Sequence, residues 1–119
     1  YLSVNVSIAQ KEVSVNELSE LNGKMYYSTI PFTGEASEYY DNGSKKEMRT
    51  YKEGLLNGQS LFYYPNSFLN KKIYYSNNKK EGKHYSYYKT GDKESVGNYK
   101  SDKREGKWKW WHFHFHFQC

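Results

Sequence analysis

The residues with the clearest capacity for chemistry lie near the end of the sequence. His112, His114 and His116 alternate with phenylalanines, and Cys119 follows them. On a strand the three imidazoles would share one face, and His-x-His spacing can supply two ligands to Zn²⁺. Cys119 has the opposite parity in an ideal strand, and no further ligand is recognisable. We therefore predict no metal site and no cofactor, and treat 113–119 as an atypical His/Phe tail.

Hydrolytic chemistry would need paired carboxylates, or a nucleophile with its base. The acidic residues are instead scattered over expected turns, where capping and solvation explain them: Asp41, Glu53, Glu81 and Glu105. His84 is the only histidine within the full repeat units, and the serines, threonines and single cysteine have no recognisable base partner. The sequence therefore predicts a protein that is not an enzyme.

Composition and charge indicate a thin β protein with a basic second half. The chain has 119 residues with a mean hydropathy of −1.08, yet it holds 14 Tyr, 6 Phe and 3 Trp. Disordered chains are poor in aromatics, whereas strands are rich in them. Residues 71–119 carry 12 Lys/Arg against 5 Asp/Glu, while residues 1–70 carry 6 against 8. A basic half favours an anionic partner, although a solvated basic face that maintains solubility explains it equally simply.

The N-terminal segment is read in two parts. Residues 1–9 are mildly apolar and end in Ser7-Ile8-Ala9, which fits the small-x-small pattern before a signal-peptidase site. We expect them to be the remnant of a signal peptide, which would make the protein exported to the periplasm or cell surface; otherwise it is cytoplasmic. The alternative is an ordinary first strand, because the same residues alternate well. Residues 10–21 are expected to form a linker or first strand.

A 24-residue repeat organises the rest of the chain. Its members are four glycines spaced by 24, a column of aromatic residues, and a column of single tyrosines that stand 17 residues after each of the first three glycines, with Tyr27 a further 24 residues before the first of them. These structural positions are Gly34, Gly58, Gly82, Gly106; Tyr39, Tyr63, Tyr87, Trp111; and Tyr27, Tyr51, Tyr75, Tyr99. Chance does not place so many aromatics in register. We assign 22–112 to repeats, with a partial unit at 22–33.

Each unit is expected to form two short strands. The first would run from the glycine to the aromatic pair, and Asn42-Gly43 predicts a tight two-residue type I′ turn after it. The second strand would end at the single tyrosine, and a looser link would lead to the next glycine. The glycine itself should mark a bend or a close approach. The predicted fold class is all-β, an elongated single-layer antiparallel β-meander of 24-residue β-hairpin repeats.

Neither face of such a sheet is purely apolar, so cross-strand aromatic pairs should provide much of the cohesion. Ser37, Leu61 and Tyr85 share one face with the first aromatic column, and Phe62 and His84 lie on the other. The exposed aromatic and basic residues are candidate binding residues: Tyr40, Tyr64, Tyr88, Trp108, Trp110, Lys107 and Lys109.

The repeat resembles the variant MORN repeat of bacteria (membrane occupation and recognition nexus), often labelled antitoxin-like. The matching features are Pro31-Phe32-Thr33-Gly34, the Tyr-Tyr-x-Asn-Gly turn at 39–43, and the Tyr-Lys-x-Gly-x-x-x-Gly link at 51–58. The resemblance covers about residues 22–111. It implies an elongated, curved antiparallel sheet without catalytic residues that binds proteins or, as once proposed, phospholipids.

The chain departs from this pattern at three turn positions. Ser67 replaces the turn glycine of the second unit, and Asn78 and Asp102 replace the link glycine found at Gly54. We therefore expect altered turns in the later units and an incomplete last strand pair.

The function expected from these features is a non-catalytic scaffold for protein–protein binding. Self-association through a free sheet edge is one form of it, because unpaired edges are templates for another chain. The alternative is binding of anionic lipid or of cell-wall carbohydrate or choline through the basic, aromatic-rich second half. Nucleic acid is an unlikely partner in this interpretation, since no recognised nucleic-acid fold signature is present.

Overall fold

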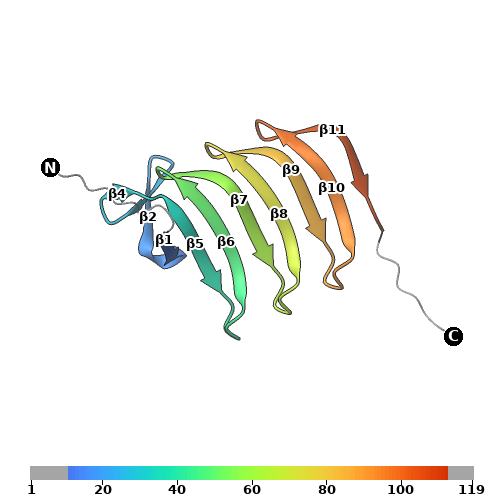
Figure 1. Ribbon diagram of the computed structural model, residues 1–119, viewed down its shortest axis with the longest axis horizontal. Coiled ribbons are helices and arrows are strands. Elements are labelled where there is room, and N and C mark those ends of the chain that lie inside the picture. The colour runs from blue at the N-terminus through green and yellow to red at the C-terminus, as the bar shows by residue number, and fades with distance from the viewer. Residues whose placement is uncertain (1–10, 113–119) are drawn as a thin grey trace.

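The computed structural model describes residues 11–112, which form strands and one short 3₁₀ turn (Figure 1). In chain order the elements are β1 (Lys11–Ser14), η1 (Val15–Glu17), β2 (Leu18–Leu21), β3 (Lys24–Tyr27), β4 (Ile30–Pro31), β5 (Gly34–Tyr39), β6 (Lys45–Lys52), β7 (Leu55–Tyr63), β8 (Leu69–Ser76), β9 (Lys79–Tyr87), β10 (Lys93–Lys100) and β11 (Lys103–Trp110). Residues 1–9, read above as a signal-peptide remnant, and the 113–119 tail lie outside the described residues.

The strands β5 to β11 form a continuous antiparallel meander in which each strand pairs with its neighbours in sequence (Figure 1). Two strands and two turns make one 24-residue unit, so equivalent residues recur on every second strand. The predicted fold class is therefore confirmed: the protein is an elongated, almost entirely β structure made of hairpin repeats.

The two faces of the meander follow from the alternation of side chains along each strand. One face, which we call the tryptophan face, carries Tyr51, Tyr75 and Tyr99 together with Trp108 and Trp110. The opposite face, which we call the paired-tyrosine face, carries Tyr39, Tyr63 and Tyr87, as expected from the sequence. Each face mixes aromatic with polar side chains, so a sheet of one layer results.

The tight turns lie at the opposite end of each hairpin from where the sequence placed them. Glu53-Gly54, Asn77-Asn78 and Ser101-Asp102 each have positive φ at both residues, between 48° and 85°. That conformation is the two-residue type I′ turn, whose twist matches that of the flanking strands. The segments expected to be loose links are thus the tight ones.

Asn42-Gly43 does not form the predicted type I′ turn. The Gly43 amide donates to the Tyr40 carbonyl at 2.9 Å, the Tyr40 amide donates to the Ser44 carbonyl at 2.8 Å, and Gly43 alone has positive φ. This is a three-residue loop ending in a left-handed residue. The prediction failed because Asn-Gly fits both turns, and the Asn42 side chain here accepts from the Ser44 amide at 2.8 Å.

The departures from the repeat pattern leave the turns unaltered, contrary to expectation. Ser67 adopts φ 76° and makes the same two loop hydrogen bonds as Gly43, from its own amide to Tyr64 and from Tyr64 to Phe68. Asn78 and Asp102 keep the φ of the link glycine, at 71° and 72°. Serine, asparagine and aspartate tolerate this backbone at modest cost when the surrounding hydrogen bonds impose it.

The repeat glycines mark bulges rather than strand starts, except for Gly34 at the beginning of β5. Around Gly58 the pairing with β6 shifts by two residues, between Tyr51↔Leu56 and Arg49↔Ser60. Gly58 has φ 110°, and a Cβ there would stand 3.3 Å from the Thr50 side chain. The sequence correctly predicted a bend and close approach, but β7 begins three residues earlier than expected, at Leu55.

The N-terminal end departs from a simple meander. β1 pairs with β5 in parallel, and β2, β3 and β4 form a separate three-stranded sheet beside it (Figure 1). The expected partial unit at 22–33 therefore does not continue the main sheet, and Tyr27 lies in β3 rather than in the column of Tyr51. Pro31 lacks the amide that a central strand needs, and Phe32, only 3% exposed, turns inward.

The main apolar core lies at this N-terminal end. Val13, Phe32, Ala36 and Tyr51 form the buried cluster, and partly buried hydrophobic residues from η1, β2, β3 and β7 pack against it. The Phe32 ring lies 6.0 Å from that of Tyr51, edge to face. The N-terminal elements thus act as a cap that covers the first unit.

Candidate functional site

The second tyrosine of each pair connects one repeat unit to the next. The Tyr40 hydroxyl donates to the Tyr63 carbonyl and the Tyr64 hydroxyl to the Tyr87 carbonyl, both at 2.7 Å, and Tyr88 donates to the Trp111 carbonyl. Burial raises the pKa of the Tyr64 hydroxyl, which keeps it a donor. Tyr40, Tyr64 and Tyr88, predicted as binding residues, therefore each connect two neighbouring units in the structure.

The first tyrosine of a pair is the more accessible one at the start of the array. Tyr39 is 53% exposed, and the ammonium of Lys45 lies 5.8 Å from its ring centre. At this unit the more exposed tyrosine is therefore Tyr39, whereas Tyr40 was selected as the candidate binding residue. The hydroxyl ladder could not be read from the sequence because both tyrosines of a pair recur with the same period.

A second ladder connects the units at the tight-turn edge. The backbone amide of Asn78 donates to the Leu56 carbonyl at 2.9 Å, while the side-chain Oδ1 of Asn78 accepts from the backbone amide of Leu56 at 2.8 Å. One unit on, Asp102 makes the same two bonds to Lys80, at 3.0 and 2.8 Å. The residues that replace the link glycine thus gain a capping function. The position equivalent to Leu56 and Lys80 in the last unit is Arg104.

The largest aromatic cluster in the described chain lies at the C-terminal end of the tryptophan face. His84, Tyr99 and Trp108 are mutually in contact, with ring centres 5.2 to 5.6 Å apart, and Trp110 stacks on Trp108 at 5.7 Å and 25°. The Arg104 guanidinium lies 5.1 Å from Trp108 and 5.4 Å from Trp110. The cluster is therefore a layer of aromatic rings with a cation on it.

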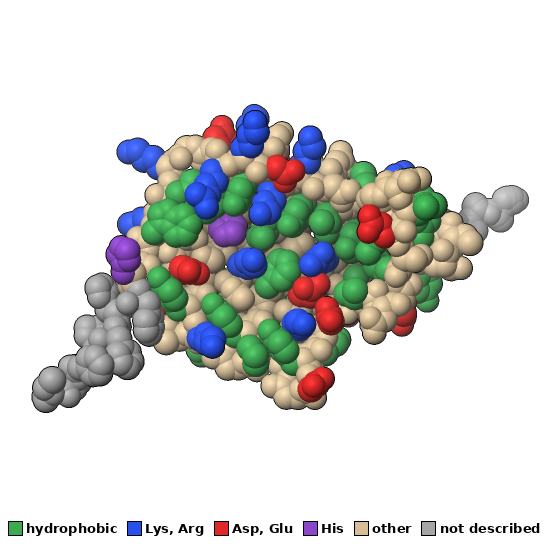
Figure 2. All heavy atoms as spheres, turned by 180° about the vertical axis from the view of Figure 1, so that it is seen from behind, with side chains coloured by type: hydrophobic (Ala, Val, Ile, Leu, Met, Phe, Trp, Pro, Cys, Tyr) green, Lys and Arg blue, Asp and Glu red, His purple; other side chains and the backbone are tan. Residues whose placement is uncertain are grey.

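Lys80 adds a second cation to this cluster, 4.9 Å from the Tyr99 ring centre. Trp110 is 52% exposed, and Arg104 is exposed as well. We call the six residues the aromatic–basic surface: Lys80, His84, Tyr99, Arg104, Trp108 and Trp110. Figure 2 shows the face with the central histidine, where hydrophobic and basic side chains intermingle toward the C-terminal end.

Trp108 can lie flat in this surface because the facing strand has no side chain there. A Cβ on Gly97 would stand 2.1 Å from the indole ring, and the indole nitrogen donates to the Asn98 carbonyl at 3.1 Å. The equivalent positions one and two units earlier are Ile73 and Arg49, beside His84 and Ser60. The sequence signal was a coincident change to Gly97 and Trp108, which sequence reasoning missed.

Lys107 and Lys109, also predicted as binding residues, are exposed on β11. Lys109 pairs with Val96 and lies over the Trp111 ring at 5.1 Å, on the face opposite Trp110. The structure therefore brings Trp108 and Trp110 together but separates Lys109 from them. The cation at these two tryptophans is Arg104, which was not among the candidate binding residues, and Lys80 lies over the neighbouring Tyr99 ring.

His84 is held neutral within the aromatic–basic surface. Burial against the rings, with the positive charges of Lys80, Lys71 and Arg104 nearby, lowers its pKa from 6.5 to about 4. Its Nδ1 is buried and has no hydrogen-bond partner among the described residues. A neutral histidine with no carboxylate or nucleophile at hand serves as an aromatic spacer rather than as an acid–base group.

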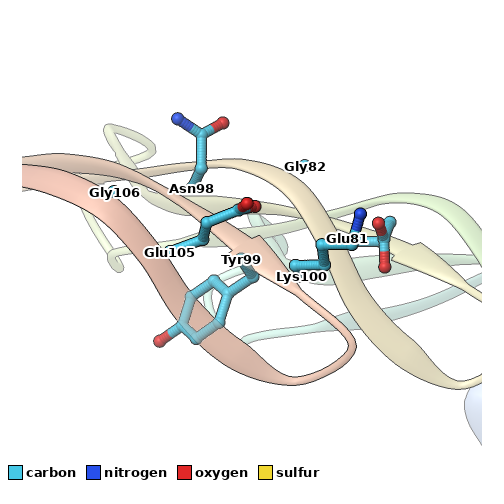
Figure 3. Close-up of a pocket in the computed structure, with 7 residues that line it drawn as sticks. All are labelled: Glu81, Gly82, Asn98, Tyr99, Lys100, Glu105 and Gly106. Carbon is cyan, nitrogen blue, oxygen red and sulfur yellow. The ribbon is translucent and has the colours of Figure 1, made fainter.

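An open hollow of about 400 Å³ lies between β9, β10 and β11, lined by Glu81, Gly82, Asn98, Tyr99, Lys100, Glu105 and Gly106. Glu105, Asn98 and Lys100 extend from the strands around it, whereas the Tyr99 ring points away (Figure 3). Glu81 already accepts from the Ser101 amide at 3.0 Å. The lining therefore offers no nucleophile–base pair.

Within residues 11–112, no three His, Cys, Asp or Glu side chains are arranged to hold a metal ion. His112 is exposed, while His114, His116 and Cys119 lie outside the described residues. No helix within the described part of the chain could span a membrane. Comparison with protein-family models, curated proteins and solved structures found no match.

Proposed function

We propose that this chain is a non-catalytic repeat scaffold that binds another protein through the aromatic–basic surface. The observation that carries the proposal is the exposed stack of Trp108 and Trp110 under Arg104. Tryptophan and arginine are the residue types most enriched at the energetic centres of protein interfaces. The resemblance to variant MORN repeats supports the same class of function, including an antitoxin-like or exported interaction protein.

Rigidity supports binding at this place. Trp108 is fixed by its bond to the Asn98 carbonyl and by the space above Gly97, so little side-chain entropy is lost when a partner covers it. The inter-unit ladders hold the strands beneath it. A preorganised aromatic platform of this kind gains affinity mainly because it is already in its bound shape.

A choline or quaternary ammonium ligand is disfavoured by the same geometry. The ring faces that would bind a cation are near the chain's own cations, Arg104 at Trp108 and Trp110, and Lys109 at Trp111. A guest cation would also meet like charges. Anionic surfaces remain the better alternative, since tryptophans beside lysines on β11 suit the interface of an anionic membrane.

Site-specific photo-crosslinking tests the proposal. A photo-reactive amino acid replaces Trp110 or, as the matched control, Tyr39, which is equally exposed at the other end on the other face. Irradiation of the cells that make the protein should give a discrete protein adduct from position 110 and none from 39. Identical adducts from both positions, or no protein adduct from 110, would contradict the proposal.

Vesicle co-sedimentation separates the lipid alternative. The full chain is mixed with vesicles that contain or lack anionic phospholipid, at low and high salt. Under the proposal, binding is weak and disappears at high salt. Strong, salt-resistant sedimentation that is lost in Trp110→Ala would favour the membrane as the partner.

A further inference from the structure

Among residues 11–112, the outer edge of β11 has none of the capping bonds that the equivalent positions Leu56 and Lys80 have. The Leu56 amide and carbonyl are both bonded by Asn78, and those of Lys80 by Asp102. Arg104 is the next member of this series, 24 residues after Lys80. Within residues 11–112 no following unit exists to supply the asparagine or aspartate that would bond to Arg104.

The strand alternation shows which groups face this edge. Lys100 and Lys103 flank the two-residue turn and exchange hydrogen bonds across it, so the Arg104 amide points away from β10. At the other end the Trp111 amide donates to the Glu94 carbonyl at 2.9 Å, which directs the preceding Trp110 amide outward. Among residues 11–112, the outward backbone groups of Arg104 and Trp110 therefore have no strand partner, and they lie beside the aromatic–basic surface.

We propose that this edge takes up an extended, acidic segment of a partner protein as one more antiparallel strand. The inference rests on the proposed function and names its partner chemistry. The segment would run antiparallel to β11 and carry an asparagine or aspartate near its carboxyl end, where it would bond to Arg104 as Asp102 bonds to Lys80.

Charge selects an acidic segment over a second copy of this chain. β11 carries four basic residues and one acidic residue: Lys103, Arg104, Lys107, Lys109 and Glu105. Pairing of two β11 strands would bring two such rows together, and like charges across a strand pair are destabilising. Carboxylates on the guest would instead complement the edge.

β10 supplies the design of the probe, because it occupies the equivalent place beside β9. Its Tyr99 faces Gly82 and its Gly97 faces His84, so a guest would place a tyrosine at Gly106 and a glycine near Trp108. The probe is a peptide copying residues 93–102 with both lysines replaced by glutamate, EESVGNYESD. The unmodified sequence, KESVGNYKSD, tests the contribution of charge.

Two N-methylated forms of the probe provide a matched control. Because Trp111 bonds to the Glu94 carbonyl, Glu94 and every second residue after it face β11, whereas Ser95, Gly97 and Tyr99 face β9. Methylating the amides of the probe that correspond to these three residues blocks the bonds to the host. Methylating the alternate amides leaves them intact and changes composition equally.

The experiment measures binding of these peptides to the full chain, with hydrogen exchange of its backbone amides read by NMR. EESVGNYESD should bind and slow exchange at Arg104 and Trp110, while the form methylated at the three host-facing amides should bind at least about fivefold more weakly, the effect of losing a single bond. The alternately methylated form should bind like the unmodified probe, and KESVGNYKSD more weakly at low salt.

A protein variant tests the same edge. Arg104→Pro deletes the outward amide at a position where an edge strand tolerates proline, and Arg104→Ala deletes only the side chain. Proline should weaken binding more than alanine. The methylated peptides decide the matter if the proline variant fails to fold.

Three results would overturn the inference: no binding of the acidic probe, equal binding of both methylated forms, or binding without slower exchange at Arg104. None of these removes the proposed function, which a protein adduct at position 110 would still support. Conversely, the peptide could still add as a strand while position 110 gives no protein adduct. That result would contradict binding through the aromatic–basic surface but support the edge of β11 as a binding site.

Discussion

The two ends of the sheet are built in opposite ways. At the N-terminal end, β1 and the small β2–β4 sheet cover the first unit, and Phe32 is 3% exposed. At the C-terminal end, β11 is exposed along nearly its whole length and Trp110 is 52% exposed. Large aromatic residues thus stabilise the fold at one end and remain accessible at the other. Within residues 11–112 no element covers β11, and an uncovered strand edge can pair with a further strand.

The largest expected loss of stability comes from disrupting the apolar core at the N-terminal end. Phe32→Ala should lower the free energy of unfolding by about 3–5 kcal/mol, because it leaves a cavity between Tyr27 and Tyr51. Trp110→Ala, which removes an even larger ring, should cost less than about 1 kcal/mol since that ring is half exposed. Chemical denaturation of both variants measures the difference. Similar losses would show that the two ends are not distinct.

A smaller effect tests how the Trp108 ring packs on Gly97. Gly97→Ala places a methyl group where the indole lies, so we expect a loss of about 1–3 kcal/mol and a change in tryptophan fluorescence. In the background of Trp108→Ala the same substitution should be nearly neutral. A double-mutant cycle in denaturant measures this coupling, and additive losses would contradict it.

The hydroxyl ladder between the ends should contribute about 1 kcal/mol per rung. Tyr64→Phe removes the donor to the Tyr87 carbonyl, which leaves that carbonyl without this bond. Tyr39→Phe serves as the control, because Tyr39 is exposed and its hydroxyl makes no hydrogen bond among the described residues. Thermal unfolding of both variants gives the comparison. Equal melting temperatures would show that the hydroxyl ladder does not stabilise the fold.

A pH-dependent effect also distinguishes the two ends. The pKa of His84 is lowered to about 4, so between its ordinary 6.5 and 4 the unfolded chain binds a proton that the folded chain does not. Stability should therefore fall as the pH decreases through this window. The bond from Ser37, aided by Lys45, lowers the pKa of Glu12 below 4.5, so the N-terminal end loses stability only in stronger acid.

Replacement of His84 separates the two contributions to acid sensitivity. His84→Phe should flatten the dependence between pH 6.5 and 4 while leaving the loss below pH 4.5. Denaturation midpoints measured across this range test the assignment. An unchanged slope in the variant would mean that another group takes up the proton.

The sequence predicted the array but not its ends or its turn order. The column of Tyr51, Tyr75 and Tyr99 correctly marked the ends of β6, β8 and β10, and strand alternation from the first aromatic column gave the faces. The inversion of tight and loose turns was missed since Glu53-Gly54 has a weaker turn signature than Asn42-Gly43.

The candidate site was predicted only in part, for a geometric reason. Trp108 and Trp110 were selected by their type and stand together as expected, but Lys109 is on the other face and Arg104 takes its place. Strand alternation alone places Lys109 opposite Trp108 and Trp110, but the sequence reading did not apply it to the lysines. The N-terminal cap was missed because a parallel strand, β1, has no turn signal linking it to β5.

The most direct measurement of the central claim is backbone hydrogen exchange of the protein alone at three equivalent amides. Leu56 and Lys80 are bonded by Asn78 and Asp102 of the following turn, whereas Arg104 faces the open edge. We expect slow exchange at Leu56 and Lys80 and fast exchange at Arg104. Equal protection of all three amides would contradict an open C-terminal edge.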